Sequence, residues 1–404
     1  MGEESARSFQ SAQGRRAGFD PPRVHGFNID ALDGLNAAIA ANLSTGDEVG
    51  LSVHVRQHGR VLADLWGGRV APGAAATAWG EDTVVNLWSL TKIVATLAIL
   101  HAVERGVLEL DLPVAAYWPE YGVQGKDAVT LAHLLSHTSG TAGWTTPFTV
   151  SDLYDHAAAA SRLAAQSPRW VPGTRSGYAA ACFGTPLSEV LRRTTGMSLR
   201  EYVEHEVTPP LGADLQVGLL PRDYPRAADL IPPVTPPPMG APLPPLFREI
   251  FRAPAITPAD AGRADWRAAD IGAANGHGNA RSVAMIGEAF LNDTLIGSEL
   301  RNQVFTPRSE GPDLVLGMNL NWGLGFALAT GPTFSRLPDT AAVWGGWGGS
   351  LLVIDPSTDL VIAYVMNKMS PDLLGSSRAY EYVELTYSAL TTSTPERPDM
   401  EEES

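Results

Sequence analysis

The chain has 404 residues, of which 44% are hydrophobic and 18% charged, and a formal net charge of −15 at pH 7. This composition is ordinary for a globular protein with a large core, and the acidic balance disfavours DNA or RNA as a partner. No apolar run reaches the ~20 residues of a membrane span, and the charged N-terminus does not read as a secretory signal. The single cysteine, Cys182, rules out an internal disulfide and fits a reducing compartment. Together, these features predict a cytoplasmic protein that does not bind a membrane.

The first part of the chain predicts an arm, a helix and a hairpin. Residues 1–24 are polar and predict a flexible N-terminal arm. Apolar residues at helical spacing over 27–43 predict a helix that begins near Asp30. Alternating apolar residues over 50–56 and 61–66 predict a β-hairpin with its turn at 57–60.

A short motif follows, at the head of an almost wholly apolar helix that is expected to end at Gly106. Ser89 and Lys92 are three residues apart, so on a helix their side chains share one face. A lysine that is partly desolvated beside a hydroxyl can lose its proton near neutral pH and act as a base. The pattern also occurs by chance, and the alternative is a helix cap with a solvated lysine. Lys92 is, however, the only one of the three lysines with a serine at this spacing.

The middle of the chain, 111–317, predicts a mainly helical region. His133 and His137 have a spacing that could hold a metal, but without a third ligand nearby we interpret them as a helix end beside a turn. Ser139 has no base at helical spacing and is interpreted as a turn residue. The proline-rich excursion 217–257, densest over 231–245, can be neither helix nor central strand, and either covers a pocket or wraps the surface.

Strands return at the end of the chain, over 322–328, 342–344, 350–354 and 360–366, before a helix over 376–391 and an acidic, disordered tail over 393–404. Strands at both chain ends predict an α+β fold. Residues 25–110 and 318–392 would form an α/β part around a central antiparallel sheet flanked by helices. The mainly helical region would be inserted into it, with the active site between the two.

Two downstream stretches could complete a site around Ser89. The first contains Tyr178. A phenol beside a cationic lysine can have its pKa lowered and can then take the serine proton. The alternative is that Tyr178 only packs at a loop–helix junction, as tyrosines often do. The glycine-rich stretch 344–350 is interpreted as a strand that a ligand can approach closely. The backbone N–H groups of Trp347 and Ser89 could then form an oxyanion hole, and the alternative is a bulged core strand.

Taken in order, these stretches resemble the serine β-lactamase-related family of the class C type, which includes family VIII carboxylesterases and lovastatin-type acyltransferases. The resemblance covers most of 28–391 and rests on Ser89-Leu90-Thr91-Lys92, on the segment 134–140, on Pro172-Gly173-Thr174 ahead of Tyr178, and on the glycine stretch. It implies a β-lactamase/transpeptidase-like fold and an acyl-serine intermediate on Ser89. It implies that Lys92 and Tyr178 share the proton transfer, with either as general base, and that no metal or organic cofactor takes part.

Two departures from the family pattern bear on the substrate. The asparagine of the family's Tyr-x-Asn motif is Ala180, and the strand that reads Lys-Thr-Gly in the family reads Trp344-Gly345-Gly346. Losing that cation disfavours the carboxylate of a β-lactam or a D-Ala-D-Ala peptide, and the indole predicts an apolar wall. We therefore predict a serine carboxylesterase acting on a small-molecule ester. The alternatives are an acyltransferase with an alcohol or amine acceptor and a non-catalytic ligand-binding protein, and nothing in the sequence indicates an oligomeric state.

Overall fold

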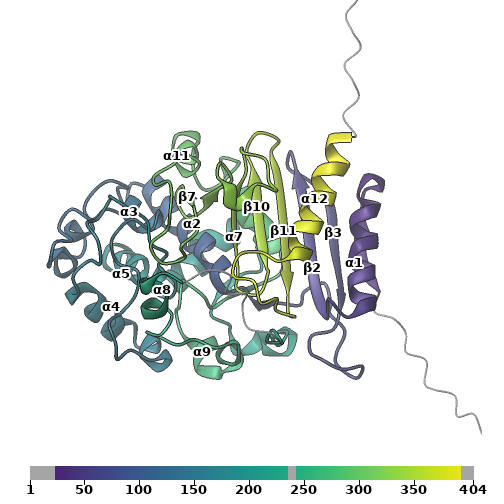
Figure 1. Cartoon of the computed structure of the whole chain (residues 1–404), viewed down its shortest axis with the longest axis horizontal. Helices are drawn as coiled ribbons and strands as arrows, with labels where there is room; N and C mark the ends of the chain where they lie inside the picture. Colours follow the sequence, from purple (N-terminus) through teal and green to yellow (C-terminus); the bar gives the residue numbers. More distant parts are fainter. Residues whose placement is uncertain (1–22, 235–242, 393–404) are drawn as a thin grey trace, which may run out of the picture.

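The computed structural model describes residues 23–234 and 243–392 and contains one large antiparallel sheet beside a mainly helical part (Figure 1). The strands of this sheet follow the order β1-β3-β2-β11-β10-β9-β8-β7. They are β1 Val24–Asn28, β2 Gly50–Gln57, β3 Arg60–Gly68, β7 Asn321–Trp322, β8 Ala327–Leu328, β9 Ala342–Gly345, β10 Leu351–Asp355 and β11 Leu360–Met366. Strands from the two chain ends meet at the β2–β11 pair, so the predicted α+β fold with a sheet built from both ends is confirmed.

Helices cover both faces of this sheet, which is why β10 and β11 are buried along their whole length and apolar except at Asp355, the last residue of β10. Helices α1 (Asp33–Thr45) and α12 (Ser377–Thr392) contact each other on one side, drawn in purple and yellow in Figure 1. Helix α10 (Ala280–Glu288) packs against β2, β10 and β11. Among the described helices, none combines the length and the hydropathy needed to cross a membrane.

The remaining helices lie in the middle of the chain. They are α2 Thr91–Glu104, α3 Leu131–Leu135, α4 His156–Ala165, α5 Gly184–Thr195, α6 Leu199–Tyr202, α7 Thr208–Leu211, α8 Pro245–Ile250, α9 Ala264–Ala268 and α11 Ser298–Val304. A second sheet has three short strands in the order β4 (Val85–Asn86), β6 (Gly276–Gly278) and β5 (Gln216–Val217). It places the segment before α2 beside β6, which is almost 200 residues further along the chain.

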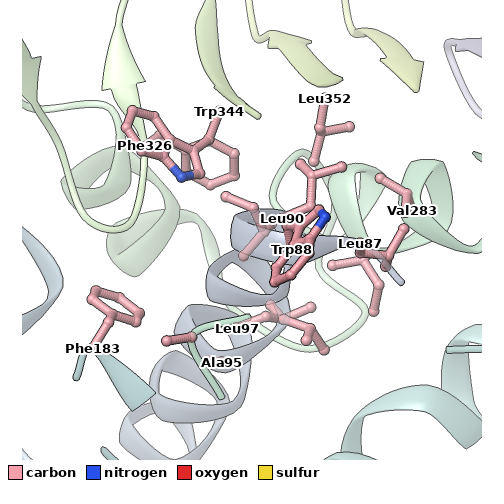
Figure 2. Close-up of a cluster of buried hydrophobic side chains, with 14 of the residues drawn as sticks. Leu87, Trp88, Leu90, Ala95, Leu97, Phe183, Val283, Phe326, Trp344 and Leu352 are labelled. Carbon is pink, nitrogen blue, oxygen red and sulfur yellow. The ribbon is translucent and has the colours of Figure 1, made fainter. Parts of the chain in front are cut away.

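Helix α2 runs through the core, as its uniformly apolar sequence predicts. All of its residues from Thr91 to Ala102 are buried, and it ends two residues before Gly106, which has a left-handed φ of 69°. Figure 2 shows side chains packed around the start of this helix, including Leu87 and Trp88 from the preceding turn and Trp344 from β9. The head of α2 is therefore fixed by packing from several segments, and so is the lysine in its first turn.

Three expectations require correction or lie outside the described residues. Val24 already belongs to β1, an edge strand that the sequence did not predict, while residues 1–22 and the tail 393–404 lie outside the described part. The stretch 344–350 is not a continuous strand, because β9 ends at Gly345 and the chain turns at Trp347 and Gly348 before β10. The N–H of Gly346 closes this turn on the Ser350 carbonyl at 2.7 Å.

Candidate active site

Ser89 lies in a tight turn that presents it at the wall of a cavity. The 3₁₀ turn Trp88–Leu90 follows β4 and continues directly into α2. Trp88 has a left-handed φ of 47°, a conformation that costs a non-glycine residue about 1–3 kcal/mol unless its surroundings enforce it. The Asn86 side chain accepts the Trp88 N–H at 3.2 Å, and the Thr91 hydroxyl donates to the Trp88 carbonyl at 2.6 Å. The turn is thus held on both sides of a half-buried serine.

Lys92 is buried directly beneath this serine. Its Nζ lies 3.2 Å from Ser89 Oγ and donates to the backbone carbonyls of Ala180 at 2.8 Å and Ala273 at 2.9 Å. Among the described residues, no carboxylate lies within ion-pair distance of this amine. Because burial disfavours the charged form, the pKa of Lys92 falls to about 7. A large fraction of the amine is therefore neutral at physiological pH.

Tyr178 reaches the same oxygen from the loop that precedes α5. Its hydroxyl donates to Ser89 Oγ at 2.7 Å, and the Lys92 Nζ lies 4.8 Å from the centre of its ring. The expectation that Lys92 lowers the pKa of this phenol is wrong, because burial of the ring and hydroxyl raises the pKa above its usual value. Tyr178 is therefore a protonated hydrogen-bond donor in the resting site.

The turn after β9 brings Trp347 to the cavity wall beside Ser89. A side chain at position 346 would collide with the Leu87 carbonyl, so Gly346 allows this turn to approach the residues before the serine. The rings of Trp347 and Trp88 lie 5.2 Å apart. Within the described residues, the backbone N–H groups of Ser89 and Trp347 have no hydrogen-bond acceptor, and both residues line the cavity.

Trp344 does not form the apolar wall that its sequence position suggested. It is buried and lies behind Tyr178, with ring centres 5.1 Å from Tyr178 and 4.8 Å from Trp322, and it does not line the cavity. Gly345 and Trp347 line the cavity in its place. The end of β9 at Gly345 explains the difference, because Trp347 lies in the turn beyond the strand and this turn brings its indole to the cavity.

The cavity in front of Ser89 has a volume of about 260 Å³ and no charged lining residue among those described. One side of it is built by α8 and the segment that follows, through Phe247, Ile250, Phe251, Pro254 and Ile256. The proline-rich excursion 217–257 therefore contributes to a pocket, and the expectation that it contains no helix is wrong, because α8 lies within it. Its contribution begins just after the 231–245 stretch, of which 235–242 lie outside the described residues.

Sequence reasoning missed partners that have no side-chain signature. The carbonyl of Ala273, which holds Lys92, belongs to a segment without any motif, since every residue carries a carbonyl. The two histidines make separate contacts. His133 caps the start of α3 through the Thr130 N–H, and His137 packs between Tyr178 and Trp322. Among the described residues, no three His, Cys, Asp or Glu side chains are placed to hold a metal ion.

The model of the beta-lactamase family matches residues 35–386. The chain belongs to the beta-lactamase family. The esterase/beta-lactamase LipL of Mycobacterium tuberculosis is 31% identical over 344 residues, which cover 80% of this chain and 77% of that protein. The crystal structure of a family VIII carboxylesterase is 32% identical with a TM-score of 0.83, covering 91% of this chain and all of that one.

These comparisons confirm the family resemblance and the β-lactamase/transpeptidase-like fold expected from the sequence. Another solved structure, simvastatin synthase LovD of Aspergillus terreus, has a TM-score of 0.69 at 19% identity, and the match covers 91% of this chain and all of that one. At that identity it shares the fold alone.

Proposed function

We propose that this member of the beta-lactamase family is a serine carboxylesterase that forms a covalent acyl-enzyme on Ser89. The observation that carries the proposal is the pair of contacts on one oxygen, since Ser89 Oγ meets both the Lys92 amine and the Tyr178 hydroxyl at the wall of an uncharged cavity. The names of two relatives above 30% identity, an esterase/beta-lactamase and a carboxylesterase, support the same chemistry.

Lys92 is the general base in this proposal. When neutral, the amine keeps its two N–H bonds on the carbonyls of Ala180 and Ala273, which leaves its lone pair for the Ser89 hydroxyl. Ser89 Oγ then bonds to the ester carbonyl carbon while its proton passes to Lys92. The N–H groups of Ser89 and Trp347 hold the negative oxygen that forms.

The intermediate collapses when the bond to the leaving alcohol breaks and that alcohol takes the proton from Lys92. Tyr178, still protonated, donates to the Ser89 oxygen as it loses and regains its proton. Water, deprotonated by the same amine, then attacks the acyl-enzyme and releases the acid. If an alcohol takes the place of this water, the same steps give acyl transfer. The apolar lining of the cavity favours that alternative by limiting access of water.

The first test is turnover of p-nitrophenyl butyrate with and without an added alcohol. We expect a burst of nitrophenol, followed by steady release, and a butyryl adduct on Ser89 in the quenched protein. Nitrocefin, whose carboxylate finds no cation in the cavity, should be turned over about 100-fold less efficiently. Absence of both burst and adduct would favour the non-catalytic alternative. The ratio of butyrate ester to butyric acid in the presence of the alcohol separates transferase from hydrolase.

An aromatic pair, Phe247 in α8 and Phe251 directly after it, predicts the acyl preference. Phe247 and Phe251 stack with ring centres 4.4 Å apart at the cavity, and α8 is fixed by the ion pair between Glu249 and Arg169. Phe251→Ala should lengthen the cavity and raise the ratio of kcat/KM for octanoate over butyrate esters by about tenfold. Phe27→Ala, at an exposed side chain on β1, is the control and should leave the ratio unchanged. An unchanged ratio in Phe251→Ala would show that the acyl chain lies elsewhere.

A further inference from the structure

Tyr178 differs from Ser89 and Lys92 because it is carried by a loop rather than by the start of α2. A loop residue whose hydroxyl must lie within hydrogen-bond distance of another side chain needs its backbone fixed from outside. Two buried side chains from distant segments do this, His137 after α3 and Asp313 before β7. We refer to these two residues as the Tyr178 clamp.

His137 holds the residues on either side of Tyr178. Its backbone carbonyl accepts the Gly177 N–H at 2.9 Å, and its ring Nδ1 accepts the Ala179 N–H at 3.2 Å. The ring is buried, and its centre lies 5.1 Å from that of Tyr178. Burial, together with the nearby Lys92, holds the pKa of His137 well below its usual value, so the ring is neutral and Nδ1 is free to accept. The carbonyl and the ring of His137 thus both bond to the segment 177–179, and its backbone has a left-handed φ of 58°.

Asp313 holds Tyr178 itself. Its Oδ1 accepts the Tyr178 N–H at 3.1 Å and the N–H groups of Val315 and Leu316 at 3.0 and 2.9 Å. Its Oδ2 accepts the indole N–H of Trp322 at 3.2 Å, and that indole lies parallel to the Tyr178 ring. No lysine, arginine or histidine of the described chain forms an ion pair with this buried carboxylate. It is therefore satisfied by N–H donors alone, and one of these is the backbone of the proposed catalytic tyrosine.

We propose that His137 and Asp313 are positioning residues for the reaction at Ser89. They fix the backbone from Gly177 to Ala179, so that the Tyr178 hydroxyl is held on Ser89 Oγ before a substrate arrives. The inference rests on the proposed function, because it assigns the clamp an effect on turnover through Tyr178. A purely structural role would instead reduce stability, or alter substrate binding through Leu316, which lines the cavity.

The test is a double-mutant cycle between the clamp and Tyr178, with kcat and KM for p-nitrophenyl butyrate as readouts. His137→Leu should lower kcat by about 10- to 100-fold with KM changed less than about threefold. In the Tyr178→Phe background, the same substitution should lower kcat by less than about threefold, because no hydroxyl is left to position. His137→Asn should recover most of the activity, since its amide oxygen can replace Nδ1 and asparagine tolerates a left-handed φ.

His133→Leu is the matched control. The His133 ring also accepts a backbone N–H, that of Thr130 at 3.2 Å, but this hydrogen bond does not involve the loop that carries Tyr178. Its loss should therefore leave kcat unchanged. If His137→Leu does not fold, Asp313→Ala replaces it in the cycle, because it removes Oδ1, the acceptor of the Tyr178 N–H. Equal losses of kcat in both backgrounds, or a loss confined to KM, would overturn the clamp. A wild-type protein without ester turnover would overturn the proposed function, and the clamp with it.

Discussion

Ser89→Ala is expected to lower kcat for p-nitrophenyl butyrate by at least about 10⁴-fold, the scale of loss when a serine nucleophile is removed. The reason is that, among the described residues, no other serine or threonine lines the cavity. Ser89 Oγ is the acceptor of the Tyr178 hydroxyl at 2.7 Å and the neighbour of the Lys92 amine, and it faces the cavity. Steady-state rates and the mass of the intact protein after rapid quenching measure the effect, and the butyryl adduct should disappear.

Ser139→Ala is the control for this experiment. Ser139 also belongs to the segment that resembles the family, but it is buried and its oxygen accepts the Thr141 N–H at 3.2 Å within a turn. Removing the Ser139 hydroxyl should leave kcat within about threefold of the wild-type value, since a hydrogen bond within a turn away from the cavity affects stability rather than chemistry. If Ser139→Ala abolished the adduct and Ser89→Ala kept it, the nucleophile would be misassigned.

The parts of the fold and site that the sequence predicts are those governed by local periodicity. The hairpin of β2 and β3 follows from side-chain alternation, and β10 and β11 follow from their short continuous apolar runs. The helix after Ser89 follows from its uniform hydrophobicity. The proximity of Ser89 and Lys92 is also local, because one helical turn separates them. Helix geometry alone therefore predicts their contact.

What the sequence could not predict depends on contacts between distant segments. The burial of the Tyr178 phenol, which sets the direction of its pKa, comes from Trp322 and Trp344, more than a hundred residues away. The exchange of Trp344 for Trp347 at the cavity follows from where β9 ends, and strand ends are weakly specified when glycines follow. The contact of Asp313 with Tyr178 has no local signal, since the two residues are far apart in the sequence.

The pH dependence of kcat/KM should identify the base. With the pKa of Lys92 lowered to about 7, the fraction of neutral amine falls about tenfold for each pH unit below that value, and kcat/KM should fall with it. Activity is therefore expected to rise from pH 5 to a plateau above about pH 8. Tyr178 cannot produce this acidic limb, because burial raises the pKa of its phenol above its usual value. Initial rates with p-nitrophenyl butyrate, corrected for nitrophenol ionisation, would measure the profile.

Lys92→Met should lower kcat by about 10²- to 10⁴-fold and remove the limb, while Lys92→Arg should be as inactive because a guanidinium keeps its proton. Lys126→Met is the matched control. Lys126 is also buried, donates to the Ala164 carbonyl at 2.9 Å and has a pKa lowered by burial, but it has no contact with Ser89. Loss of the Lys126 amine should reduce thermal stability and leave the fall of kcat/KM below about pH 7 unchanged. A limb that persisted in Lys92→Met would assign the base to another group and leave Lys92 as a fixed donor that orients the serine.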